Sequence, residues 1–179
     1  MRSGALFLAG DGASPQGNRT VVDRWDPASG KKERLFHAEP GRHETFVGFL
    51  DDAEQRLLVR SESPSDAPSL VVLDRQTGQR TTLLAFPDAT AALTKGIQKR
   101  LVKYQREDGV PLSGTLYLPA TWKEGDKLPC LVWAYPLEYS QASDAGQVRQ
   151  APNRYLRIGG SSHLSLLLAG YAVFDDAAM

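Results

Sequence analysis

An internal repeat in the first half of the chain limits its fold more than any other feature. Residues 6–36, "LFLAGDGASPQGNRTVVDRWDPASGKKERLF", align with residues 57–84, "LLVRSESPSDAPSLVVLDRQTGQRTTLL". The alignment matches Asp26, Ser29 and Gly30 to Asp74, Thr77 and Gly78, at a spacing of 48 residues. In each copy a β-branched run ends in aspartate, passes a Ser/Thr-Gly pair and continues after basic residues. This pattern predicts two similar hairpins whose turn glycines adopt positive φ.

Two more strand-like runs, "ETFVGFL" and "QRLLVRSE", lie between the two copies. About four strands in a unit of roughly 50 residues is typical of one blade of a β-propeller. A propeller closes with about four to eight blades, and residues 1–97 supply one complete blade and most of a second. We therefore expect residues 1–97 to form propeller blades that are incomplete as a propeller.

Residues 98–179 have a different pattern. Alternating runs flank the Asp108-Gly109 pair, which is a strong hairpin signal. The continuous apolar run "LPCLVWAY" predicts a strand buried on both faces, with Cys130 packed in the core. The segment "SSHLSLLLAGYAVFDD" predicts a helix capped by Ser161 or Ser162 and ended by Gly170, followed by a strand. Hairpin, strand, loop, helix and strand together indicate the beginning of an open α/β sheet.

Charge and residue spacing argue against several classes of partner. The 21 basic and 21 acidic residues cancel, so no net field attracts nucleic acid or an anionic membrane surface. The apolar runs are shorter than the roughly 20 residues needed to cross a bilayer. The single cysteine excludes an intrachain disulfide and a cysteine-built zinc site, and His37 and His43 have no ligand-spaced partner. We expect no metal and no organic cofactor.

Two stretches of the second half resemble a known family. Propeller blades that continue into "DGVPLSGTLYLPATWKEGDKLPCLVWAYP" resemble the prolyl oligopeptidase family of serine peptidases, in which a β-propeller precedes an α/β-hydrolase domain. The stretches "LVKYQREDGVPLSGTLYLP" and "AGQVRQAPNRY" are most similar to its glutamyl endopeptidase-like branch. The resemblance implies the C-terminal blades of a propeller at 1–97 and the N-terminal part of an α/β-hydrolase domain at 98–179. It also implies a peptide substrate, cleaved by acyl transfer.

The resemblance assigns a role to Tyr135, at the end of the apolar run. In an α/β-hydrolase the loop after this strand contributes to the oxyanion hole, and in this family a tyrosine hydroxyl there is one of the donors. Tyr135 occupies the matching position. Pro136 departs from the family pattern, in which small residues follow this tyrosine, and it has no N–H to donate. Tyr139 is the alternative donor, and an aromatic residue that covers the strand end is the structural alternative.

The polar loop from Ser140 to Tyr155 is longer than most connections in compact domains. It contains Arg149 and Arg154, whose planar guanidinium groups are suited to bind an acidic side chain or a peptide carboxylate. We consider both arginines as substrate-binding residues, with solvated surface arginines as the alternative.

The sequence contains no G-x-S-x-G nucleophile elbow. "GGSSH" is the nearest pattern, but we expect its serines to cap a helix and not to form a catalytic pair with His163. Asp175 and Asp176 end the last strand, where solvated or loop-bonding roles are expected.

The resemblance therefore places the catalytic Ser, Asp and His beyond Met179, and we expect the chain to be an internal piece of a serine peptidase that is inactive alone. The remainder of its own chain is then its partner. The alternatives are a carboxylesterase or acyl-peptide hydrolase on the same scaffold, and a short non-catalytic propeller protein that binds other proteins.

Overall fold

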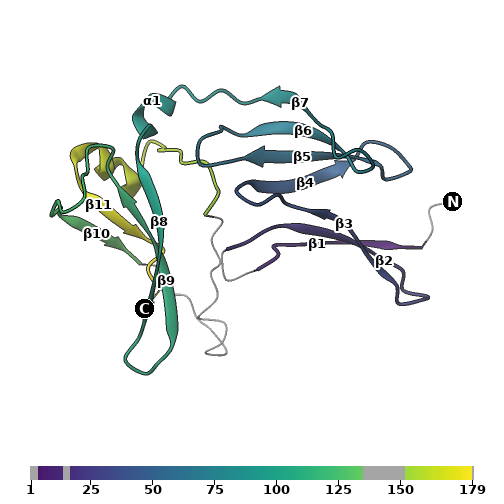
Figure 1. The fold of residues 1–179 in the computed structure, drawn as a ribbon, viewed down its shortest axis with the longest axis horizontal. Helices are drawn as coiled ribbons and strands as arrows, with labels where there is room; N and C mark the ends of the chain where they lie inside the picture. The colour runs from purple at the N-terminus through teal and green to yellow at the C-terminus, as the bar shows by residue number, and fades with distance from the viewer. Residues whose placement is uncertain (1–3, 14–16, 135–151, 179) are drawn as a thin grey trace. The chain divides into compact units, whose positions relative to one another are not determined.

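The computed structural model describes residues 4–13, 17–134 and 152–178 (Figure 1). The chain divides into two compact units, Met1–Pro87 with Arg149–Tyr155, and Asp88–Val148 with Leu156–Met179. Within the described residues, no helix has both the length and the apolar character needed to cross a membrane.

The first unit contains two antiparallel sheets (Figure 1). One has the order β1-β2-β3, formed by Leu6–Gly10, Val21–Trp25 and Lys32–His37. The other has the order β4-β5-β6-β7, formed by His43–Phe49, Arg56–Glu62, Ser69–Asp74 and Arg80–Ala85. Within each sheet, strands that are consecutive in sequence pair with one another, because short turns join antiparallel neighbours.

The β2–β3 and β6–β7 turns confirm the repeat read from the sequence. Asp26 and Asp74 each accept a hydrogen bond from the backbone N–H two residues later, at 2.9 Å in both turns. Gly30 and Gly78 both have a φ of 70°. In this left-handed region a side chain costs energy, so the two glycines serve the same purpose in the two turns.

Apolar side chains from both sheets form the core of the first unit. The buried residues of this core are Val22, Phe36, Ala38, Leu57, Val59 and Val71. They come from β2, β3, β5 and β6 and from the residue that follows β3, so the two sheets bury their facing sides against one another. Phe7 of β1 and Phe49 of β4 add an aromatic contact between the sheets, with ring centroids 4.9 Å apart.

A charged group is buried beside this core. The Glu44 side chain on β4 is 0% exposed. One of its oxygens accepts a hydrogen bond from Ser61 Oγ at 2.7 Å, and the other accepts one from the Glu39 N–H at 3.1 Å. The Arg80 guanidinium pairs with Glu44 and also with the Glu39 carboxylate, at 2.9 Å. A buried carboxylate needs such partners, because removing it from water is costly.

The second unit contains a mixed sheet with the order β10-β11-β9-β8. Its strands are β8 (Gln98–Gln105), β9 (Pro111–Leu118), β10 (Cys130–Trp133) and β11 (Ala172–Asp175). A four-residue helix, α1 (Ala91–Thr94), precedes the sheet, and the 3₁₀ helix η1 (His163–Ala169) precedes β11. β8 and β9 form the hairpin expected at Asp108-Gly109, with Gly109 at a φ of 87°.

The β10–β11 pair is parallel, while the other pairs of this sheet are antiparallel. Parallel neighbours require a crossover connection, and η1 lies in that connection. Leu164 and Leu167 of η1 pack with Tyr117 and Val173 to form the core of this unit. Their spacing of three residues matches the three-residue turn of a 3₁₀ helix.

The helix caps are confirmed, but the expected burial of β10 is wrong. Ser162 Oγ accepts the Leu164 N–H at 3.2 Å, and Gly170 ends η1 at a φ of 86°. Cys130, predicted to lie in the core, is exposed, and Val132 is 56% exposed. Side chains alternate between the two faces of a strand: Leu131 packs on the core that includes η1, whereas Cys130 and Val132 point to the opposite face, which the described residues leave exposed.

We expect Gly114→Ala to destabilise the second unit. A Cβ atom at Gly114 on β9 would lie 2.5 Å from the Phe174 ring and 3.2 Å from the Ala177 Cα. Overpacking of this kind typically costs about 1–3 kcal/mol, and urea denaturation would measure the change. Gly48→Ala is the control, because Gly48 is also in a strand and has no atom within 4 Å of such a Cβ. Equal stability of the two variants would contradict the prediction.

Candidate functional site

The carboxyl ends of β10 and β11 place several polar and aromatic side chains together. In open α/β sheets, ligands bind at the carboxyl edge of the parallel strands. Trp133 is the last residue of β10, Asp175 is the last residue of β11, and the two are partners in the parallel register. These side chains therefore meet at the carboxyl ends of two adjacent parallel strands.

His163, the first residue of η1, joins these two strand ends. Its Nε2 lies 2.8 Å from Asp175 Oδ1, within hydrogen-bonding distance. Its ring stacks on the Trp133 indole, with centroids 4.5 Å apart and planes 8° apart. The side chains of His163 and Asp175 are 23% and 15% exposed, so water competes only weakly for this hydrogen bond.

The backbone after β11 turns back onto the same strand end. Asp176 has a positive φ of 49°, which is unusual for a residue with a side chain. The next residue, Ala177, donates its N–H to the Trp133 carbonyl at 3.2 Å. The turn at Asp176 therefore adds a backbone contact at the end of β10.

Burial sets the electrostatics around this edge. It raises the pKa of the Asp176 carboxyl, and the Asp175 carboxylate adds to the rise, while His163 and Lys99 oppose it. The pKa of Tyr117 is also raised, mainly by burial and then by the two carboxylates. A buried phenol with a raised pKa stays neutral at physiological pH.

Sequence reasoning did not anticipate the contact between His163 and Asp175, although the pattern contained a signal for it. The helix of a crossover starts near the carboxyl end of the first parallel strand, and the second strand ends at that same edge. A histidine at the start of the helix and an aspartate at the end of the strand are thus expected neighbours. Ser162, beside His163, uses its hydroxyl to cap η1.

Of the three site residues expected from the sequence, the structure describes only one. Tyr135 and Arg149 lie outside the described residues, as does the alternative Tyr139. Arg154 is described and belongs to the first unit. Its Nε donates to His43 Nε2 on β4 at 3.3 Å, so its guanidinium already has one partner within the protein. A substrate-binding role for Arg154 stays a prediction.

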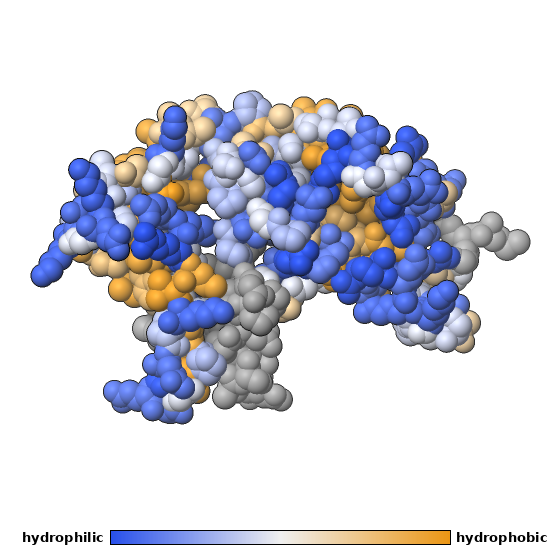
Figure 2. Space-filling model, viewed as in Figure 1, coloured by the Kyte–Doolittle hydropathy of each residue, from blue (hydrophilic) through white to orange (hydrophobic). Residues whose placement is uncertain are grey.

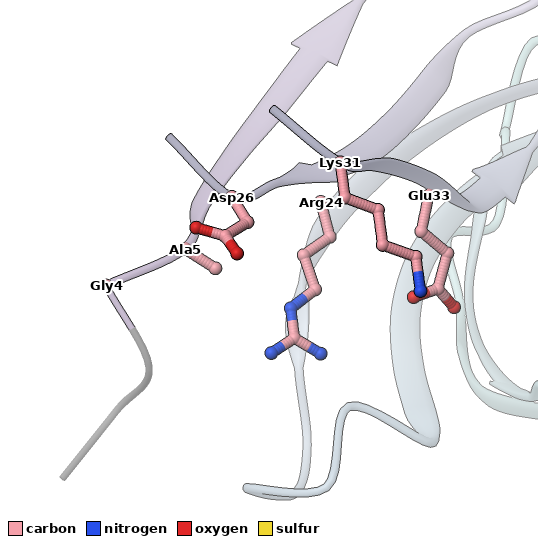
Figure 3. A pocket seen from close by; sticks show the side chains of 6 residues that line it. All are labelled: Gly4, Ala5, Arg24, Asp26, Lys31 and Glu33. Atoms are coloured by element: carbon pink, nitrogen blue, oxygen red, sulfur yellow. The ribbon is translucent and has the colours of Figure 1, made fainter. Parts of the chain in front are cut away.

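The first unit also has a pocket of about 360 Å³, lined by Gly4, Ala5, Arg24, Asp26, Lys31 and Glu33 (Figure 3). The lining combines basic and acidic side chains in equal number, so their charges cancel. The pocket therefore favours neither an anionic nor a cationic ligand.

Comparison with known proteins gives sequence relatives over nearly the whole chain. Two proteins named "Probable glutamyl endopeptidase, chloroplastic", from Arabidopsis thaliana and Oryza sativa subsp. japonica, are 36% and 33% identical to it, each over 95% of this chain. The chain spans about a fifth of their length, 19% in both cases. No protein-family model matches the chain.

Solved structures of peptidases share its fold. The AtxE2 isopeptidase matches with a TM-score of 0.57 and 21% identity, over 98% of this chain and 24% of its own. Oligopeptidase B from Leishmania major matches with a TM-score of 0.55 and 14% identity, again over 98% of this chain and 24% of its own. At these identities the similarity concerns the fold.

Proposed function

We propose that the chain is part of a serine peptidase that hydrolyses peptide bonds by acyl transfer, because it is similar over 95% of its length to two proteins named "Probable glutamyl endopeptidase, chloroplastic". The observation that carries this proposal is the 36% identity to such a protein over 95% of the chain. Because the relatives' name contains "glutamyl endopeptidase", peptides that contain glutamate are the substrates to test first.

In this proposal residues 1–97 are β-propeller blades. The four strands β4–β7 form one sheet, and the hairpin β2–β3 repeats the turn of β6–β7, as successive blades would.

The outermost strands of both sheets expose apolar side chains, including Leu8 of β1 at 43% and Leu83 of β7 at 63%. Figure 2 shows hydrophobic patches on the surface of the molecule among hydrophilic residues. Neighbouring blades, from the remainder of the same protein, would cover these strands.

Residues 98–179 are, in the same proposal, the N-terminal part of an α/β-hydrolase domain. The parallel β10–β11 pair with its crossover through η1 supports this, because such crossovers are the building units of α/β folds. The domain boundary near residue 97 is part of the proposal.

We assign the oxyanion-hole donor to Tyr135, two residues after the end of β10. A phenol donates a stronger hydrogen bond than an aliphatic hydroxyl. A donor held in place beforehand stabilises the negative charge of the tetrahedral intermediate as it forms. Arg149 and Arg154 are the candidates for binding an acidic substrate group. The nucleophile would come from outside these residues, because they contain no G-x-S-x-G sequence.

The proposal predicts that activity requires more than these 179 residues. We expect a fluorophosphonate serine probe to label the full-length protein and not the 179-residue chain, because the chain lacks the nucleophile elbow. Only the full-length protein should hydrolyse glutamate-containing peptides. Labelling of the short chain at Ser161 or Ser162 would contradict this prediction.

The same assays separate the alternatives. Hydrolysis of simple esters without peptide hydrolysis would favour a carboxylesterase on the same scaffold. A full-length protein that neither reacts with the probe nor hydrolyses any of these substrates would favour a non-catalytic binding protein.

A further inference from the structure

The two repeats of the first unit correspond in their strand pairing as well as in their sequence. Each has a shift of register between the second and third residues of the strand before its turn, which is β2 in the first repeat and β6 in the second. The two shifts are 48 residues apart, the same spacing as the two turns. A bulge at the same place makes Leu35 and Phe36 of β3 the counterparts of Leu83 and Leu84 of β7.

These counterparts differ in burial. Leu35 and Phe36 are 6% and 3% exposed, and Phe36 lies in one core cluster with residues of β5. Leu83 and Leu84 are 63% and 50% exposed. The apolar pair that the second sheet buries in the first repeat is therefore left uncovered by the described residues in the second repeat.

A second apolar pair shows the reverse pattern. Leu57 and Val59 of β5 are both 0% exposed, whereas Leu6 and Leu8 of β1 are 49% and 43% exposed. The two pairs are counterparts, because their register partners on β2 and β6 are again 48 residues apart. We call the pair on β3 or β7 the trailing face of its repeat, and the pair on β1 or β5 the leading face. The trailing face of the first repeat packs on the leading face of the second.

The trailing face of the second repeat points away from the first sheet. Leu84 is the register partner of Leu70 on β6, so the two side chains lie on the same face of their sheet. The next residue of β6, Val71, points to the opposite face, and it belongs to the core shared with the first sheet. A further sheet can therefore pack on Leu84 from the side opposite to the first sheet.

We propose that Leu83 and Leu84 pack against the leading face of the first repeat of the full-length protein, which lies before residue 1 in the sequence. The inference rests on the propeller part of the proposed function. Within the chain, a trailing face meets the leading face of the repeat that follows it. Residues 88–179 contain no third copy of the repeat, and the chain enters the second unit at Asp88. The repeat whose leading face has no preceding repeat to cover it is the first one.

The length of the relatives leaves room for this additional repeat. The chain spans 19% of their length, and a propeller needs about four to eight blades. In a closed ring of such sheets the first and last repeats become neighbours, although they are far apart in the sequence. Apolar side chains then hold the ring together at this point, because no short connection joins the two repeats.

The test uses the full-length protein with the photo-crosslinking residue p-benzoylphenylalanine in place of Leu84. After irradiation we expect a crosslink within a single polypeptide, to a segment that precedes residue 1, and peptide mass spectrometry would locate it. The control carries the same group in place of Phe36, the counterpart of Leu84, and should crosslink to β5. Three results would overturn the proposal: a crosslink from position 84 to residues after 179, a crosslink to a second copy of the protein, or no crosslink from position 84 while position 36 reacts.

A substitution gives a second readout in the full-length protein. We expect Leu84→Asp to lower the melting temperature by roughly 5 °C or more, because a carboxylate would enter an apolar contact without a partner. Thr81→Asp is the matched control on the same strand, because Thr81 is exposed and its counterpart in the first repeat is the exposed Glu33. Equal melting temperatures of the two variants would show that Leu84 stays in contact with water, which contradicts the proposal.

Neither measurement requires peptidase activity, so the failure of the proposed function would look different. A full-length protein that hydrolyses no peptide but gives the expected crosslink would overturn the peptidase and keep the contact between the first and last repeats. A protein that hydrolyses peptides without this crosslink would overturn the contact alone.

Discussion

Replacing Tyr135 by phenylalanine in the full-length protein is expected to lower kcat by about 10²- to 10³-fold, which corresponds to roughly 3–4 kcal/mol of activation free energy. The substitution removes the donating hydroxyl and keeps the ring, so packing at the strand end should survive. KM should change little, because the hydrogen bond strengthens only as charge develops in the transition state. Steady-state kinetics on a glutamate-containing peptide would measure both constants.

Tyr139→Phe is the matched control for this prediction. It makes the same chemical change four residues later in the sequence and should leave kcat close to that of the wild type. A large loss of kcat in Tyr139→Phe with none in Tyr135→Phe would transfer the donor role to Tyr139. Small and equal effects would indicate that neither phenol donates and that backbone N–H groups form the oxyanion hole.

The second large effect is expected from Arg80→Ala, which should reduce the free energy of unfolding by about 3 kcal/mol, the lower end of the range for breaking a buried ion pair. The reason is the carboxylate left behind: Glu44 is 0% exposed, and it would lose its nearer guanidinium partner without gaining water, while Arg42 Nε stays 4.0 Å away. Ser61 and the Glu39 N–H still donate to it, which keeps the loss moderate. Urea denaturation would measure the change.

Arg56→Ala is the control in the same unit. Its Nε lies 3.1 Å from Asp51, but the arginine side chain is 57% exposed, and exposed pairs contribute little to stability. Arg80→Lys should be intermediate, because an ammonium keeps the charge but lacks the fork that contacts both Glu39 and Glu44. An Arg80→Ala variant as stable as Arg56→Ala would show that the hydrogen bonds to Glu44 and the more distant Arg42 guanidinium suffice without Arg80.

The features predicted correctly from the sequence depend on residues close together in the chain. The turn at Asp26 and Gly30 and the cap at Ser162 involve contacts across two to four residues. Side-chain type determines such local geometry, because few residues tolerate positive φ or bond their own backbone.

The features that sequence reasoning missed depend on neighbours that are distant in the chain. Cys130 and Val132 are exposed because they lie on the face of β10 that the described residues leave uncovered, and an apolar run does not reveal which face is covered. The contact between Glu44 and Arg80 joins residues 36 positions apart on strands that are not adjacent in the sheet. Pairing between such strands follows from tertiary packing, which local patterns do not encode.

The strand order β10-β11-β9-β8 also determines when this sheet can form during translation. β10 is synthesised before β11, yet β11 lies between it and β9. Among the described strands, the segment "CLVW" therefore has no partner until roughly 40 more residues have been made, which takes about 2–8 s at a rate of roughly 5–20 residues per second. During that interval this apolar segment stays unpaired, which is the state in which strands are prone to aggregate.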